Sequence, residues 1–211
     1  MDENKSWMID YTALDSMELL QTTNERAFRI PVFFSHPNIN FLNQTQKNFI
    51  NRLIIEIENA LLFPRTLPDT EQYPETVITN ARRLIYSSYG LIAAALATQR
   101  VRILEFSSGD NPPQQPVWQT GPFLQIEPAM AYQYGLPMLF IREKKVEPSG
   151  VFAPGNTPFL SFLEWDSTKP IDDFFHSIQW KEVFQNWVAH VRNGYYIQTN
   201  PPFQYKCDNI D

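Results

Sequence analysis

Cysteine is almost absent from this sequence of 211 residues. The only one is Cys207, close to the C-terminus. A single cysteine can form neither an internal disulfide nor a cysteine-based metal cluster, and the simplest interpretation is a protein of a reducing compartment. We therefore expect a cytoplasmic location.

Long hydrophobic runs are also missing. The longest apolar stretch, around residues 91–97, is far shorter than the roughly 20 residues that a membrane-spanning helix needs. The first twenty residues, MDENKSWMIDYTALDSMELL, are acidic and lack the apolar centre of a signal peptide. We expect neither a secretory leader nor a membrane partner.

Positive charge is scarce and scattered. The 17 Lys and Arg residues are outnumbered by 23 Asp and Glu residues, and no basic stripe is visible, so nucleic acid is not expected as a partner. The phosphate-binding patterns GxGxxG and GxxxxGK[ST] are absent, which argues against a dinucleotide-binding Rossmann protein or a P-loop NTPase. His176 and His190 lie fourteen positions apart without metal-ligand spacing, so we expect no metal and no cofactor.

Apolar residues make up 43% of the chain, which is typical of a folded domain with a sizeable core. Short apolar runs alternate with longer amphipathic segments. The runs predict strands at 30–34, 61–68, 91–96, 137–141 and 158–166, and the amphipathic segments predict helices at 41–61, 74–89, 128–135 and 172–193. The prolines in 61–68 place that strand at a sheet edge.

This order of elements predicts an α/β fold with three layers, flavodoxin-like or Rossmann-like, around a mainly parallel sheet of four or five strands. We expect residues 30–211 to form the domain, with 137–141 inside the sheet, and residues 1–29 to be an appendage. The helix at 172–193 is apolar on more than one side, which indicates a homo-oligomer, most simply a two-fold dimer. The alternative is a monomer in which the first thirty residues cover the second face.

Ligands of parallel α/β sheets gather at the carboxyl ends of the strands. There the sequence places Ser35, His36 and Asn38 after the first strand, Arg65 after the second, and the loop that leads to Glu127. His36 could donate a proton or bind a phosphate, or it could cap nearby backbone. Arg65 could hold a phosphate or carboxylate, or it could be a solvated surface charge.

Glu127 stands between a Gly-Pro turn and a segment of small residues. Pro128 suits the first position of a helix, which would put Glu127 at the positive end of the helix dipole and keep its carboxylate ionised, as a nucleophile requires. The alternative is a favourable first-turn charge without a functional role. Glu143, which is followed by two lysines, is interpreted as part of a charged surface run.

The stretch around Glu127 has a recognisable pattern. It consists of Thr120-Gly121, Glu127, Ala129, Ala131-Tyr132, Gly135, Pro137 and the apolar run MLFI, after an upstream segment ARRLIYSSYGLIAAAL. This pattern resembles the nucleoside 2-deoxyribosyltransferase-like superfamily, which has a flavodoxin-like fold. The resemblance implies that Glu127 is the nucleophile that attacks the sugar C1′, with Gly121 and Tyr132 among the substrate-binding residues.

Toll/interleukin-receptor (TIR) domains share this layout, and their first strand resembles the run VFFSHP of this chain. Their enzymatic members use a helix-borne Glu to cleave NAD. Both resemblances imply a hydrolase or transferase that acts on the N-glycosidic bond of a nucleoside, a nucleotide or NAD. The transferases often complete their sites with a neighbouring subunit's C-terminal segment, which here would be the region 195–205.

The sequence departs from the family pattern at two places, and the first departure favours another class of function. The transferases carry an Asp after the strand that corresponds to LIAAAL, and this chain has none there. They also carry a Tyr or a similar group after the first strand, where this chain has Phe34-Ser35-His36. The alternative is a non-catalytic nucleotide-binding sensor or the scaffold subunit of an assembly.

Overall fold

The computed structural model of the chain describes residues 29–67, 74–156 and 161–199. The appendage expected at residues 1–29 lies outside the described residues except for Arg29. The second half of the region 195–205 lies outside them as well.

The centre of the molecule is a five-stranded sheet in which every neighbouring pair of strands is parallel. Its strands are β1 (Ile30–Ser35), β2 (Leu62–Arg65), β3 (Leu91–Ala95), β6 (Met138–Glu143) and β7 (Ser161–Trp165). Their order across the sheet is β2-β1-β3-β6-β7. The prediction of a parallel sheet is confirmed, as are the edge position of β2 and the interior position of β6.

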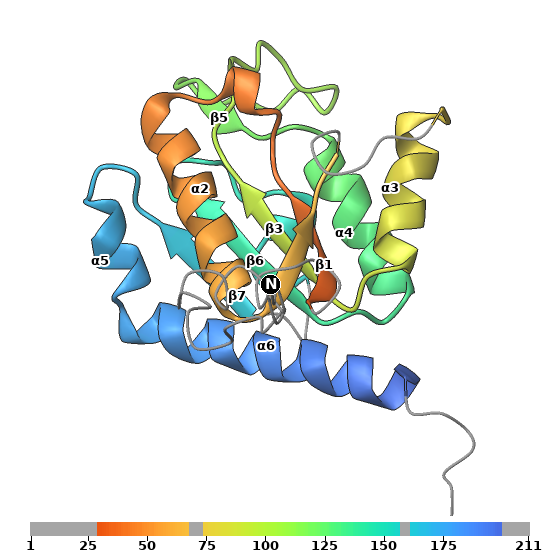
Figure 1. Ribbon diagram of the computed structural model, residues 1–211. Coiled ribbons are helices and arrows are strands. Elements are labelled where there is room, and N and C mark those ends of the chain that lie inside the picture. Colours follow the sequence, from red (N-terminus) through yellow and green to blue (C-terminus); the bar gives the residue numbers. More distant parts are fainter. Residues whose placement is uncertain (1–28, 68–73, 157–160, 200–211) are drawn as a thin grey trace, which may run out of the picture.

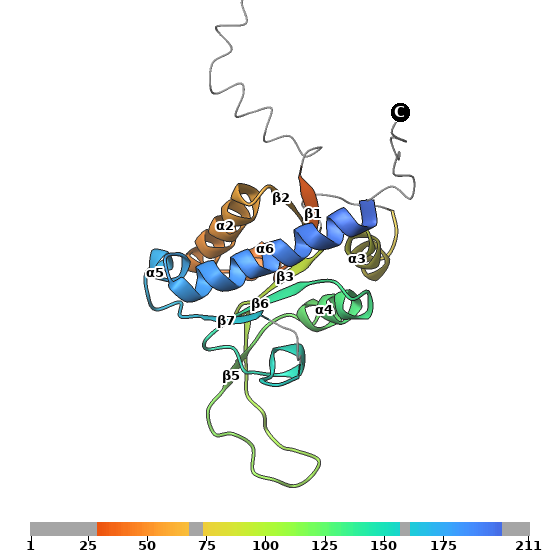
Figure 2. The same cartoon turned by 90° about the horizontal axis from the view of Figure 1, so that it is seen from below.

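Helices cover both faces of this sheet, which confirms the three-layer architecture (Figure 1). The helices are α2 (Gln44–Asn59), α3 (Val77–Tyr86), α4 (Phe123–Gln133), α5 (Ile171–Phe175) and α6 (Ile178–Thr199). One buried cluster joins the sheet to α2, α5 and α6, and a second cluster joins the opposite face to α3 and α4. Seen from below, α6 crosses from the side of α5 to the side of α3 (Figure 2).

The strands are apolar on both faces because both faces are covered. All five residues of β3 are buried. In β1, Phe34 packs in the cluster with α2 and α6, whereas Phe33 packs in the cluster with α3 and α4. This alternation explains why the sequence of each central strand is a continuous apolar run.

A capping box sets the start of helix α2. The side chain of Asn43 accepts the N–H of Gln46, and the side chain of Gln46 accepts the N–H of Asn43. This capping box satisfies two backbone donors at the helix start. The helix predicted over 41–61 therefore begins three residues later, after a 3-10 turn at Ile39–Phe41.

The boundaries of α3 also differ from the prediction. Thr76 caps the helix by accepting the N–H of Thr79, so Pro74 lies before the helix and not at its first position. The helix ends at Tyr86, and Gly90 does not stop it. Gly90 instead permits close packing, because a Cβ atom there would lie 2.5 Å from a methyl group of Val191 on α6.

The helix α4 begins five residues before the predicted start at 128. Pro122 caps it, and Pro128 lies inside it. Proline at this position cannot donate to the carbonyl of Leu124, but the helix continues to Gln133. Gly135, with a φ of 67°, follows the helix as predicted.

The single helix predicted over 172–193 is divided into α5 and α6. Ser177 lies at the break, where its hydroxyl oxygen accepts the N–H of Trp180. Most of the apolar residues of α6 that indicate a subunit interface are buried against the chain's own sheet. They are Trp180, Phe184, Trp187, Val188 and Val191. The homo-oligomer therefore stays a prediction.

A second, two-stranded antiparallel sheet was not predicted. It pairs β4 (Gln99–Val101) with β5 (Val117–Gln119) beyond the carboxyl end of β3. The segment between these two strands projects away from the main sheet (Figure 2). Across the described part of the chain, no helix is both long enough and apolar enough to cross a membrane.

Candidate functional site

A cavity of about 400 Å³ opens at the carboxyl ends of β1 and β3. The chain leaves β1 outward to β2 and returns past β1 to β3, so these two neighbouring strands flank a topological switch point. Sites of open parallel sheets form at such points because the loops after the two strands diverge. His36 follows β1, Thr98 follows β3, and both line the cavity.

Glu127 lines the same cavity from the second turn of α4, and its residue is only 7% exposed. The hydroxyl of Ser35, the last residue of β1, donates a hydrogen bond to its Oε2 atom. Ser35 is itself buried. The structure thus brings together two residues that the sequence placed on separate elements, and one of them fixes the orientation of the other.

Burial raises the pKa of Glu127 to about 7, although the hydrogen bond from Ser35 acts in the opposite direction. The prediction that Glu127 lies at the start of the helix is wrong, and burial, not the helix dipole, dominates its pKa. Glu127 is the fifth residue of α4, and the effect of the dipole is confined to the first turn. Loss of hydration dominates instead, because a buried carboxylate has few water molecules to stabilise its charge.

His36 lies at the cavity wall with both ring nitrogens engaged. Its Nδ1 lies 2.8 Å from the carbonyl oxygen of Pro37, and its Nε2 lies 3.1 Å from the hydroxyl of Thr66. A carbonyl can only accept, so Nδ1 carries a hydrogen. The ring also packs against Phe34, with centroids 4.8 Å apart.

The remaining predicted binding residues lie at different distances from the cavity. Asn38 and Gly121 line it. Arg65 does not line it, and its guanidinium donates to the carbonyl and hydroxyl oxygens of Ser87 at the end of α3. Tyr132 is also not part of the lining, and it is 60% exposed on the last turn of α4.

Several residues of the cavity wall were not predicted. They include Phe41, Leu67, Glu75, Val77, Asn80 and Phe123. Most of them lie near the start of a helix, on the segments that follow the strands. The sequence signal for such residues is an apolar side chain in the turn before a helix, as Phe41 is before α2, and the structure leaves Phe41 exposed.

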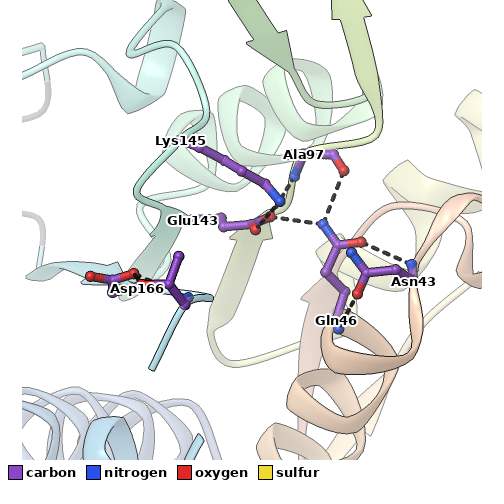
Figure 3. A network of polar contacts seen from close by, with 7 residues as sticks. Asn43, Gln46, Ala97, Glu143, Lys145 and Asp166 are labelled. Carbon is purple, nitrogen blue, oxygen red and sulfur yellow. Dashed lines mark hydrogen bonds and ion pairs between the residues drawn. The ribbon is translucent and has the colours of Figure 1, made fainter. Parts of the chain in front are cut away.

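A second buried carboxylate stands at the end of β6 (Figure 3). Glu143 is fully buried, and its Oε2 accepts the backbone N–H of Ala97 and the side-chain amide of Gln46, each at 2.8 Å. Its Oε1 lies 2.8 Å from the ammonium group of Lys145. The interpretation of Glu143 as a surface charge is wrong, because β6 continues through Arg142 and carries Glu143 into the interior.

Burial raises the pKa of Glu143, but hydrogen bonds from Lys145, Ser167, Ala97 and Gln46 outweigh it and hold the pKa below its usual value. The carboxylate therefore stays ionised at neutral pH. It ties the end of β3 to the start of α2 and the end of β6, since Gln46 also donates to the carbonyl of Ala97 at 3.0 Å. Ala97 directly precedes Thr98, so this network holds a wall of the cavity in place.

The lining of the cavity is mixed in character. Within residues 29–67, 74–156 and 161–199, no group of three or more His, Cys, Asp or Glu side chains is arranged to hold a metal ion. The walls combine aromatic and aliphatic side chains with a few polar groups around one buried carboxyl. Such a combination is typical of small-molecule sites.

No protein-family model matches this sequence, and no curated protein sequence matches it significantly. Solved structures do resemble it. A CMP N-glycosidase from Clostridium botulinum, BcmB, matches with a TM-score of 0.42 and 13% identity, over 68% of this chain and 95% of its own. A 2-deoxyribosyltransferase from Leishmania mexicana matches with a TM-score of 0.40 and 13% identity, over 76% and 98%.

The TIR domains of the activated Roq1 resistosome match with a TM-score of 0.36 and 12% identity, over 81% of this chain and 98% of theirs. The three structures thus include a deoxyribosyltransferase and TIR domains, the two groups that the sequence resembles. At these identities and TM-scores the likeness concerns the arrangement of the chain and assigns no activity.

Proposed function

We propose that this protein cleaves the N-glycosidic bond of a nucleoside-like substrate and passes the glycosyl group to water or to another acceptor. In this proposal the carboxylate of Glu127 faces the sugar C1′. The observation that carries this proposal is the buried carboxyl of Glu127 in the cavity wall, oriented by the hydroxyl of Ser35. A carboxylate in this environment can stabilise the positive charge that develops on the sugar, or it can form a covalent bond to C1′.

The reaction uses the ionised form of Glu127. With a pKa of about 7, roughly half of the molecules carry that form at neutral pH before substrate binds. The Ser35 hydroxyl leaves the other carboxylate oxygen available to the sugar. Poor solvation of the carboxylate strengthens its attraction for the developing cation, because the site offers few water molecules to compete.

The remaining volume of the cavity suits a planar base. Phe41, Phe123, Leu67 and Val77 provide aromatic and aliphatic surface around the opening. Aromatic rings stack on bases through dispersion and offset ring contacts. We expect the base to lie among these side chains and the sugar to lie against Glu127.

The test compares the wild-type protein with Glu127→Gln, which keeps the shape of the side chain and its acceptor for Ser35. Each protein is incubated with ribonucleosides, deoxynucleosides, nucleoside monophosphates and NAD, and the free base is quantified by chromatography. Glu182→Gln, an exposed substitution on α6, is the control for a change of net charge. Base released by the wild type and by Glu182→Gln, but not by Glu127→Gln, supports the proposal, and equal release by all three contradicts it.

The second candidate function is binding without cleavage, and the engaged ring of His36 favours it. Both ring nitrogens of His36 contact polar groups of the protein itself, so His36 does not offer a proton to a leaving base. Calorimetry with the same ligands distinguishes the two functions. A ligand that binds tightly and is recovered intact indicates a sensor, whereas the absence of any binding indicates a scaffold.

A further inference from the structure

The cavity has an unusual charge composition for a site that would bind a nucleotide. Among the described residues that line it, none is Lys or Arg, and the ionisable ones are His36, Glu75 and Glu127. Arg83, which lies outside the lining, is paired with the lining residue Glu75 at 2.7 Å. A phosphate group entering this cavity would meet carboxylates and no cationic side chain among these residues.

The start of α4 does not replace the missing cations. Helix starts bind phosphates through backbone N–H groups that have no partner within the helix. Here Pro122 has no N–H, the N–H of Leu124 donates to the carbonyl of Gly121 at 3.2 Å, and that of Gln125 donates to the carbonyl of Pro122 at 2.9 Å. Few donors at this helix start are therefore available to an anion.

The site is also poor in proton donors for a departing base. A neutral purine or pyrimidine leaves as an anion unless an acid protonates it, and such acids typically contribute about 10²- to 10⁴-fold in rate. The ring of His36 is engaged at both nitrogens. Glu127 cannot protonate the base in the same step in which its ionised form stabilises the sugar cation.

We propose that this cavity selects unphosphorylated nucleosides whose base carries a permanent positive charge, such as pyridinium ribosides or ribosides of N7-alkylated purines. The cation would be attracted by Glu127 and Glu75, and its π-system would stack on the aromatic wall at Phe41 and Phe123. This inference rests on the function proposed above and names the substrate class for the same site.

The chemistry of such a substrate needs no acid. When the bond between C1′ and the cationic ring nitrogen breaks, the bonding electron pair goes to that nitrogen, and the base leaves as a neutral molecule. The positive charge moves to the sugar, where the carboxylate of Glu127 neutralises it. Water then adds its oxygen to C1′ and releases one proton to solvent, so the overall reaction consumes one water and produces one proton.

The experiment uses compounds that differ in one charged group at a time. Nicotinamide riboside and 7-methylguanosine carry the charged base, while reduced nicotinamide riboside and guanosine are their neutral counterparts. Nicotinamide mononucleotide adds a phosphate to the first of these. Each rate with the full-length protein is divided by the spontaneous rate of the same compound, because cationic nucleosides are intrinsically more labile.

We expect the enhancement of kcat/KM for each charged nucleoside to exceed that for its neutral counterpart by about tenfold, because the carboxylates of the cavity attract the cationic base and no comparable attraction acts on a neutral one. We also expect the phosphate of the mononucleotide to lower the enhancement. Equal or greater enhancement for guanosine, or for the mononucleotide, would overturn the inference while the proposed function stands. No cleavage of any compound would overturn the proposed function, and binding measurements would then decide the inference.

Binding is measured by calorimetry with the same pairs of compounds. We expect the charged member of each pair to bind about tenfold more tightly, and Glu75→Gln to remove much of this preference. Glu182→Gln is the matched control, and the melting temperature of each variant shows whether it is folded. A preference that is absent in the wild type contradicts the inference, and a preference that persists in a folded Glu75→Gln contradicts the part assigned to Glu75.

Discussion

Glu127 costs the folded protein free energy at neutral pH. Its pKa is raised from 4.5 to about 7 in the fold, so the folded state binds the proton more tightly than the unfolded chain does. Below pH 4.5 both states are protonated and the cost vanishes. Stability falls as pH rises from 4.5 to 7, and above pH 7 the whole cost is present.

Replacing Glu127 by Gln should therefore stabilise the protein in a pH-dependent way. At pH 8 we expect a gain of about 3 kcal/mol in the free energy of unfolding, since one pKa unit corresponds to about 1.4 kcal/mol. Near pH 4.5 the gain should nearly vanish. Urea unfolding of both proteins at the two pH values measures the difference, and a gain independent of pH would show that the carboxyl is not the cause.

The same pKa predicts the pH dependence of any activity. If the ionised form of Glu127 acts on the sugar, kcat/KM should rise tenfold per pH unit below about pH 7 and level off above it. The profile is measured with nicotinamide riboside, whose pyridinium charge does not change in this range. A rate that falls above pH 7 would assign Glu127 the role of an acid.

The sequence predicts Glu127 as a site residue but does not predict its environment. The residue types around it indicated a site, whereas its depth in α4 depends on where the helix begins, and Pro128 matched a helix start as well as it fits the interior. The prediction of a surface position for Glu143 is wrong for a related reason. The two lysines after it indicated a surface, and only the extent of β6 determines on which side of that boundary Glu143 lies.

At the scale of the elements, Gly90 permits helix α6 to pack closely on the turn before β3. We expect Gly90→Ala to lower the free energy of unfolding by about 1–3 kcal/mol, because the added methyl group overlaps with Val191. Gly194→Ala, inside α6, is the matched control. Its added methyl group meets nothing within 4 Å, so we expect it to stabilise the protein by up to about 1 kcal/mol.

Both glycine variants are compared with the wild type by urea denaturation at one pH. Equal stabilities of Gly90→Ala and the wild type would mean that α6 does not approach the turn as closely as the structure indicates.

The network around Glu143 joins three elements, so its loss should lower the stability of the whole domain. Glu143→Ala leaves the N–H of Ala97 and the amide of Gln46 without their acceptor in the interior, which should cost about 2–4 kcal/mol. The lowered pKa adds stability that is present above pH 4.5 and lost as pH falls through the folded value.

The exposed Glu147→Ala is the control and should change the stability by less than about 0.5 kcal/mol. Thermal unfolding at pH 7 compares the variants. Equal melting temperatures of Glu143→Ala and Glu147→Ala would contradict the structural role.

The main elements were predictable because their apolar patterns reflect how they are buried. The strands β1, β3 and β6 have apolar residues on both faces and are short, whereas α2 has an apolar stripe on one side and is long. The period and the length of the apolar pattern therefore distinguish the strands from the helix. β4 and β5 have three residues each and no fully buried side chain, so neither pattern nor length indicated them. They pair across the segment 102–116, and their residues are exposed or only partly buried.

At the scale of the whole molecule, the association state is still a prediction. The apolar side chains of α6 are used within the chain, but the outer surface of α3 and α4 exposes Tyr86, Tyr132 and Tyr134. Exposed aromatic surface favours association, so we expect a dimer. Light scattering over a range of concentrations tests it, and a constant mass near the chain mass of 24.7 kDa would exclude the dimer.

The two edges of the sheet differ in how they resist unwanted aggregation. An exposed edge strand can recruit further strands and start the growth of fibrils. At one edge, β2 has only four residues and contains Pro64, which removes a backbone donor and interrupts any added strand. At the other edge, β7 has five residues and no proline. When the protein is concentrated or partly unfolded, fibril growth should therefore begin at the β7 edge.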